Sequence, residues 1–232
     1  MKRVALGVRM HSGWGVLVAV SGDGSVGKGS RKILDAVEVA DSLEIIDRRR
    51  IVIVDATQEV DEAKETGSGI RGPNQPSHCA ATLVHPKLGL QKAEKHLADC
   101  AAASERLALA AVGEVVRELD GRGFRIVGAA VLLASGRALP SLAKILAAHP
   151  LIHTAEGEFF RNAVRKACER LKIPVIAIPE RELEERAKTA FGKAASRVQG
   201  RIADAGSSIG PPWTKDHKSA TLAAAMILAL SS

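Results

Sequence analysis

The chain has 232 residues, and its 33 Lys and Arg against 26 Asp and Glu give a formal net charge of +7. A hydrophobic fraction of 46% with 25% charged residues is ordinary for a globular protein and excludes a disordered or fibrous class. Aromatic residues make up only 3%, with no Tyr, which argues against binders that stack bases on aromatic side chains. The basic balance instead favours contact with a polyanion.

The length and the lack of an obvious linker predict a single domain over residues 1–232. The three cysteines are far apart and odd in number, as expected of reduced thiols. Arg9 and His11 interrupt the apolar start of the chain, so it does not resemble a signal peptide. The apolar run near the C-terminus is too short to cross a bilayer. We therefore expect a cytoplasmic protein with no membrane partner.

Five segments have the composition of β-strands. Two of them flank a small, polar turn and predict a hairpin, whereas the last two are continuous apolar runs, typical of strands covered on both faces. The predicted strands cover residues 3–8, 15–20, 45–54, 125–134 and 175–178.

Apolar residues at three- and four-residue steps predict helices between and after these strands. The predicted helices cover residues 90–119, a segment from near 156 to 171, 180–202 and 215–230, with Thr214 as the N-cap of the last. The polar segment 59–76 is predicted to be a mobile loop. The segment 22–29 resembles a phosphate-binding loop, but Gly29 lacks the hydroxyl that such a loop needs, so a plain connection is favoured.

The order of these elements resembles the ribonuclease H-like fold, and within it the branch of RuvC-type Holliday-junction resolvases. The opening RVALGVRMHSGWGVL is similar to that branch's first hairpin. The stretch RKACERLKIPVIAIPERELEERA is similar to its helix, strand and following helix, and DHKSATLAAAMILAL to its final acid-bearing helix. The resemblance implies an α/β protein with a mixed five-stranded sheet flanked by helices, and a function on nucleic acid.

The chemistry implied by this resemblance needs three or four carboxylates around two divalent metal ions. In this sequence Arg9 stands at the end of the first strand, where the family carries its first Asp. The residues 134–136 (Ala-Ser-Gly) stand where a Glu is expected, and Asp216 in the last helix is the remaining counterpart. Because a cation at the first position repels Mg²⁺, we expect no Mg²⁺- or Mn²⁺-dependent cleavage.

A second group of polar residues lies near residue 156. His153 is a candidate proton carrier, and Glu156 or Glu158 a candidate metal ligand or general base. Ordinary helix-start acids and a surface histidine are the alternative. Asp55, at the end of the third strand, and Asp216 are the candidate metal ligands. If these displaced acids form an active set, Mg²⁺ is the expected cofactor; otherwise no cofactor is expected.

Positively charged residues could bind a phosphate or carboxylate near Asp216. The candidate ligand-binding residues are Arg9, Ser12, Arg161, Lys215 and Lys218. Trp213 is either a wall of this site or a core residue. Three hypotheses remain open: a protein without the usual metal-binding acids that binds nucleic acid or a phosphorylated ligand, an active nuclease or phosphodiesterase with displaced acids, and a non-catalytic interaction scaffold such as a homodimer.

Overall fold

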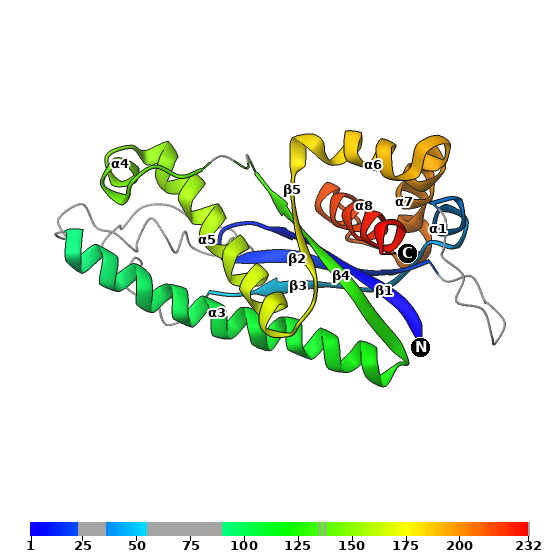
Figure 1. Ribbon diagram of the computed structural model, residues 1–232, viewed down its shortest axis with the longest axis horizontal. Coiled ribbons are helices and arrows are strands. Elements are labelled where there is room, and N and C mark those ends of the chain that lie inside the picture. Colours follow the sequence, from blue (N-terminus) through cyan, green and yellow to red (C-terminus); the bar gives the residue numbers. More distant parts are fainter. Residues whose placement is uncertain (23–35, 55–89, 135, 137, 232) are drawn as a thin grey trace.

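The structure, a computed structural model, describes residues 1–22, 36–54, 90–134, 136 and 138–231 (Figure 1). The sequence predictions for Asp55, for the loop 59–76 and for nearly all of the segment 22–29 lie outside these residues. Within the described part of the chain, no helix is both long and apolar enough to span a bilayer.

Five strands form one mixed sheet in the order β3-β2-β1-β4-β5. The first three strands are β1 (Lys2–Met10), β2 (Trp14–Ser21) and β3 (Glu44–Val52). β2 pairs antiparallel with β1 on one side and with β3 on the other. β4 (Phe124–Leu133) lies parallel to β1 on its other side, and β5 (Val175–Pro179) lies parallel to β4. This confirms the predicted mixed five-stranded sheet, and the topology is consistent with a ribonuclease H-like fold.

Helices cover both faces of the sheet (Figure 1). α3 and α5 pack on one face, and α8 packs on the other together with α1, α6 and α7. The helices are α1 (Ala36–Ser42), α3 (Leu90–Gly121), α4 (Leu142–Leu146), α5 (His149–Arg170), α6 (Leu183–Phe191), α7 (Ala195–Ile209) and α8 (Lys215–Leu230), with short 3₁₀ turns at Glu180–Glu182 and Gly192–Ala194.

The alternation of side chains along β1 divides them between the two faces. Val4, Leu6 and Val8 are buried in the cluster under α3 and α5. Ala5 and Gly7 face α8, and a Cβ atom at Gly7 would stand 1.8 Å from the carbonyl oxygen of Ala220. Arg9 continues this second series, so its side chain lies on the α8 side of the sheet at the end of β1.

The start of α8 is held by contacts from distant parts of the chain. Arg48 on β3 donates hydrogen bonds to the carbonyls of Ile209 (2.7 Å) and Gly210 (2.9 Å), at the end of α7. The indole Nε1 of Trp213 donates to the carbonyl of Ile202 (2.8 Å), and the half-buried ring packs against the core under α8. Thr214 is the N-cap of α8, as predicted. These contacts fix the first turn of α8 beside the end of β1.

Two predicted helix boundaries are wrong. α5 begins at His149 rather than near residue 156, with a proline in its first turn, where the missing backbone N–H costs nothing. The single helix predicted over 180–202 is divided into a 3₁₀ turn, α6, a second 3₁₀ turn and α7. The break falls at Gly192, whose φ of +51° is a left-handed conformation that favours glycine.

Candidate functional site

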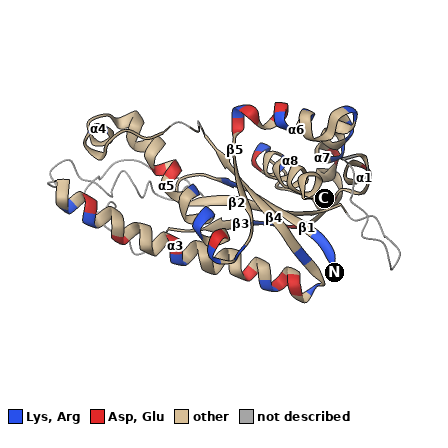
Figure 2. Cartoon of the chain, viewed as in Figure 1, with Lys and Arg blue, Asp and Glu red and all other residues tan. Residues whose placement is uncertain are grey.

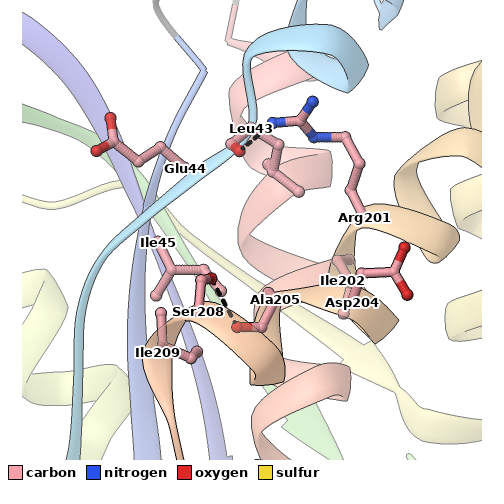
Figure 3. A pocket seen from close by; sticks show the side chains of 9 residues that line it. All are labelled: Leu43, Glu44, Ile45, Arg201, Ile202, Asp204, Ala205, Ser208 and Ile209. Atoms are coloured by element: carbon pink, nitrogen blue, oxygen red, sulfur yellow. Dashed lines mark hydrogen bonds between the residues drawn. The ribbon is translucent and has the colours of Figure 1, made fainter.

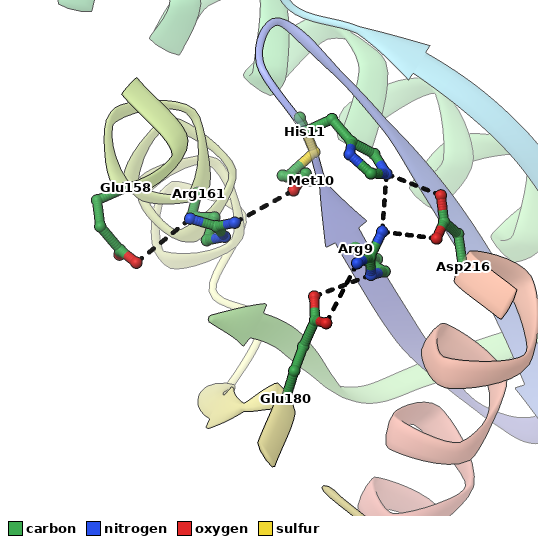
Figure 4. A network of polar contacts seen from close by, with 7 residues as sticks. All are labelled: Arg9, Met10, His11, Glu158, Arg161, Glu180 and Asp216. Atoms are coloured by element: carbon green, nitrogen blue, oxygen red, sulfur yellow. Dashed lines mark hydrogen bonds and ion pairs between the residues drawn. The ribbon is translucent and has the colours of Figure 1, made fainter. Parts of the chain in front are cut away.

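A cluster of charged side chains lies at the carboxyl ends of β1 and β5, beside the first turn of α8 (Figure 4). Because β1, β4 and β5 run parallel, their carboxyl ends lie along the same edge of the sheet. Arg9 comes from the end of β1, Glu180 directly follows β5, and Asp216 lies in the first turn of α8. We refer to Arg9, His11, Glu180 and Asp216 as the Arg9 cluster.

Arg9 lies between the two carboxylates of this cluster. Its Nε and Nη2 atoms donate to the two oxygens of Glu180 at 2.8 Å and 3.2 Å, and its Nη1 atom donates to Asp216 Oδ1 at 2.6 Å. The side chains are only 17% (Arg9), 27% (Glu180) and 20% (Asp216) exposed. Charge-assisted hydrogen bonds in such partly buried positions are stronger than those between exposed groups. The guanidinium therefore acts as the fixed counter-charge of both carboxylates.

His11 completes the cluster on the side of the β1–β2 turn. Its Nε2 atom lies 2.7 Å from Asp216 Oδ2 and 2.8 Å from Arg9 Nη1. In the tautomer that carries the proton on Nε2, the ring donates to Asp216, which then accepts from both His11 and Arg9. The imidazole also stacks on Trp14, with 4.4 Å between ring centroids, and the Arg50 guanidinium lies 4.6 Å from the Trp14 ring. The Trp14 ring thus contacts both His11 and Arg50.

A second arginine approaches the end of β1 from α5. Arg161 Nη2 donates to the carbonyl of Met10 at 3.4 Å, and Nη1 donates to Glu158 at 3.3 Å (Figure 4). Burial lowers the pKa of Arg161, and the nearby Glu158 carboxylate opposes this shift. A Cβ atom at Gly157 would stand 2.6 Å from Arg161 Nη1, so Arg161 fills the space that the glycine leaves.

The candidate acids of α5, Glu156 and Glu158, contact other residues than those of the Arg9 cluster. Glu156 is buried, and its Oε2 atom lies 3.5 Å from Nδ1 of His153. Glu156 and Glu158 also line an apolar pocket of about 390 Å³ between α3, α4 and α5. Asp216 instead contacts Arg9 and His11. Among the described residues, which do not include Asp55, no three His, Cys, Asp or Glu side chains form a group able to hold a metal ion.

The Arg9 cluster does not fit the two-metal centre that the sequence resemblance implies. Mg²⁺ requires oxygen ligands in near-octahedral geometry. Here the oxygens of Glu180 and Asp216 are directed at a guanidinium. A fixed positive charge at this position also opposes the binding of a dication at short range. The described residues therefore support no metal-dependent step at this site.

The remaining candidate ligand-binding residues lie around the cluster. Ser12 is in the turn between β1 and β2. Lys215 and Lys218 are exposed on the first turn of α8, on either side of Asp216 in the sequence. Sequence analysis missed His11 and Glu180. The position of Glu180 in the sequence could have identified it as a candidate. It directly follows a buried strand, and functional side chains often lie at the carboxyl ends of parallel strands.

A second pocket, of about 440 Å³, lies between the start of β3 and α7 (Figure 3). It is at the opposite end of β1 from Arg9, because Glu44 pairs with Ser21 and Ser21 with Val4. Two of its polar side chains bond to backbone carbonyls: Arg201 to Leu43 and Ser208 to Ala205. The pocket contains none of the candidate site residues.

Comparisons with known proteins gave matches among solved structures alone. A scan against protein-family models and a search of curated proteins found no match. The chain is similar to the Thermus thermophilus RuvC structure, with 13% identity and a TM-score of 0.45 over 96% of this chain and 91% of that one. It is also similar to T. thermophilus RuvC in complex with Holliday junction substrate, with 13% identity and a TM-score of 0.44 over 97% and 91% of the two chains.

Proposed function

We propose that the protein binds nucleic acid through the basic surface around the carboxyl end of β1, without cleaving it by two-metal catalysis. The observation that carries this proposal is the guanidinium of Arg9, bonded to both Glu180 and Asp216. In a two-metal phosphodiesterase such carboxylates hold the ions that activate water and stabilise the leaving oxygen. Here the guanidinium of Arg9 supplies the positive charge that metal ions supply in such an enzyme.

Exposed cations around this cluster are the groups proposed to contact phosphates. Lys215 and Lys218 are exposed on α8, and Arg50 is exposed beside Trp14. The net charge of +7 favours a polyanion over a neutral ligand. Along α3, by contrast, the basic side chains are mixed with acidic ones (Figure 2). The surface at the end of β1 is therefore a better candidate than α3. Because Arg9 is paired with Glu180 and Asp216, its proposed role is to hold the site in place rather than to bind the phosphate.

The double substitution Lys215→Ser/Lys218→Ser is expected to weaken binding to DNA or RNA about tenfold or more at low salt. Each lysine that neutralises a phosphate releases counterions, so the slope of log K against log salt should also fall by about 1 per lysine. Fluorescence anisotropy with labelled single-stranded, duplex and four-way junction probes, at low and moderate salt, measures both quantities.

The matched control is Lys188→Ser/Lys193→Ser, which removes the same charge from exposed residues at the far end of α6 from Glu180. Its affinity should stay within about twofold of the wild type. An equal loss in both double variants would mean that net charge alone attracts the probe, which contradicts the proposed surface. No binding at either salt concentration would remove the proposal and favour a non-catalytic scaffold.

The same probes, incubated with Mg²⁺ or Mn²⁺, test the alternative of an active nuclease with displaced acids. We expect every probe to remain intact. Metal-dependent cleavage that disappears in Asp216→Asn or Glu156→Gln would contradict the non-cleaving assignment and establish the alternative.

A further inference from the structure

Two histidines at the start of α5 present nitrogen atoms to each other. His149 and His153 are exposed, one helical turn apart, and their Nε2 atoms lie 2.9 Å from each other. Their rings meet edge to face, with 4.5 Å between centroids and 87° between planes. The two Nε2 atoms therefore face each other across one hydrogen bond at the surface.

The ring of His153 is also placed by a buried carboxylate. Nδ1 of His153 lies 3.5 Å from Oε2 of Glu156, whose side chain is 0% exposed. This is an ion-pair distance rather than a hydrogen bond, so Glu156 places negative charge beside the ring, and a proton on Nδ1 would leave the lone pair of Nε2 facing Nε2 of His149. A carboxylate that orients a histidine through its second nitrogen is the usual support of a metal-binding imidazole.

The separation of the two Nε2 atoms suits a shared ion. Two nitrogens about 2.0–2.1 Å from one ion, at an angle between about 90° and 109°, stand about 2.8–3.4 Å apart. The observed 2.9 Å lies within this range. A transition-metal ion could therefore be bound by small adjustments of the two rings, with no change in the backbone of α5.

We propose that His149 and His153 form a surface site for a divalent transition-metal ion, with Glu156 as the orienting carboxylate. Imidazole ligands suit Zn²⁺, Cu²⁺ and Ni²⁺, whereas Mg²⁺ and Ca²⁺ prefer oxygen ligands. The amino end of a helix carries partial positive charge, which opposes a bound cation. The carboxylate of Glu156 offsets this charge. The proposal is independent of the nucleic-acid function proposed for the Arg9 cluster.

Titration of the untagged full chain with Ni²⁺ by isothermal calorimetry tests the site. We expect one Ni²⁺ ion per chain, with His149→Ala and His153→Ala each weakening the affinity at least tenfold. Both side chains are exposed, so neither substitution should unfold the protein. Glu156→Gln should weaken the affinity about tenfold through the orientation of His153, provided that its circular dichroism shows an intact fold.

The matched control is His96→Ala, which removes an exposed helical histidine whose partner one turn on is the buried Cys100 rather than a second histidine. Its Ni²⁺ affinity should equal that of the wild type. Wild-type protein without Ni²⁺ binding, or Ni²⁺ binding that persists in His149→Ala/His153→Ala, would overturn the proposal. An unchanged affinity in a folded Glu156→Gln variant would overturn the role of that carboxylate.

Discussion

Replacing Gly7 by alanine is expected to lower the free energy of unfolding by at least about 3 kcal/mol, because the added methyl group has no space. Its Cβ atom would stand 1.8 Å from the carbonyl oxygen of Ala220 and 3.1 Å from the amide nitrogen of Ala224. Both atoms belong to the backbone of α8, so no side chain can rotate away. Chemical denaturation, followed by circular dichroism, measures the loss.

Gly200→Ala is the matched control for this substitution. Gly200 lies in α7, and no heavy atom would come within 4 Å of its Cβ. Because alanine favours a helix interior over glycine, this variant should gain about 0.5–1 kcal/mol. A Gly7→Ala variant as stable as the wild type would show that α8 does not approach β1 as closely as described, and would also move the first turn of α8 away from Arg9.

Arg9→Met is expected to lower the free energy of unfolding by about 2–3 kcal/mol. The substitution keeps an apolar chain of similar length but leaves Glu180 and Asp216 together without their cation. Removing one partner from a fully buried ion pair costs about 3–5 kcal/mol, and the partial exposure of these side chains reduces that figure. Thermal and chemical unfolding of both proteins at neutral pH measures the difference.

Arg186→Met serves as the control for Arg9→Met. Arg186 pairs with Glu182 at 2.8 Å, but the two side chains are 46% and 33% exposed, so the loss should stay below about 0.5 kcal/mol. The triple variant Arg9→Met/Glu180→Gln/Asp216→Asn should regain most of the stability lost in the single variant, because it leaves no unpaired charge. Equal losses for Arg9→Met and Arg186→Met would contradict the special role of the Arg9 cluster.

The strands could be predicted from the sequence because each has a local signal. β1, β2 and β4 are nearly continuous apolar runs because both of their faces are buried, and such runs can be recognised from residue type alone. The first two turns of α5 were missed. Their residues from His149 to Ala155 include no fully buried side chain, so the apolar stripe that marks the rest of the helix is weak there.

The candidate site could be predicted only in part. The sequence shows a cation at the end of the first strand, but the partners of Arg9 depend on distances between separate elements. Glu180 is 171 residues away in the chain, and it reaches Arg9 although β4 lies between β1 and β5 in the sheet. The hypothesis of a displaced set of acids rests on residue type alone. Residue type does not show that Glu156 contacts His153, because that contact depends on the direction of the side chains along α5.

Binding of Mn²⁺, measured by electron paramagnetic resonance on the wild type and on Arg9→Asp, tests most directly whether Arg9 takes the place of a metal ion. We expect no Asp216-dependent binding of Mn²⁺ in the wild type at millimolar concentrations, because the guanidinium already neutralises Glu180 and Asp216. Arg9→Asp should bind Mn²⁺ through the added carboxylate and these two, and lose it on further substitution of Asp216→Asn. Mn²⁺ bound by the wild type and lost in Asp216→Asn would contradict this account.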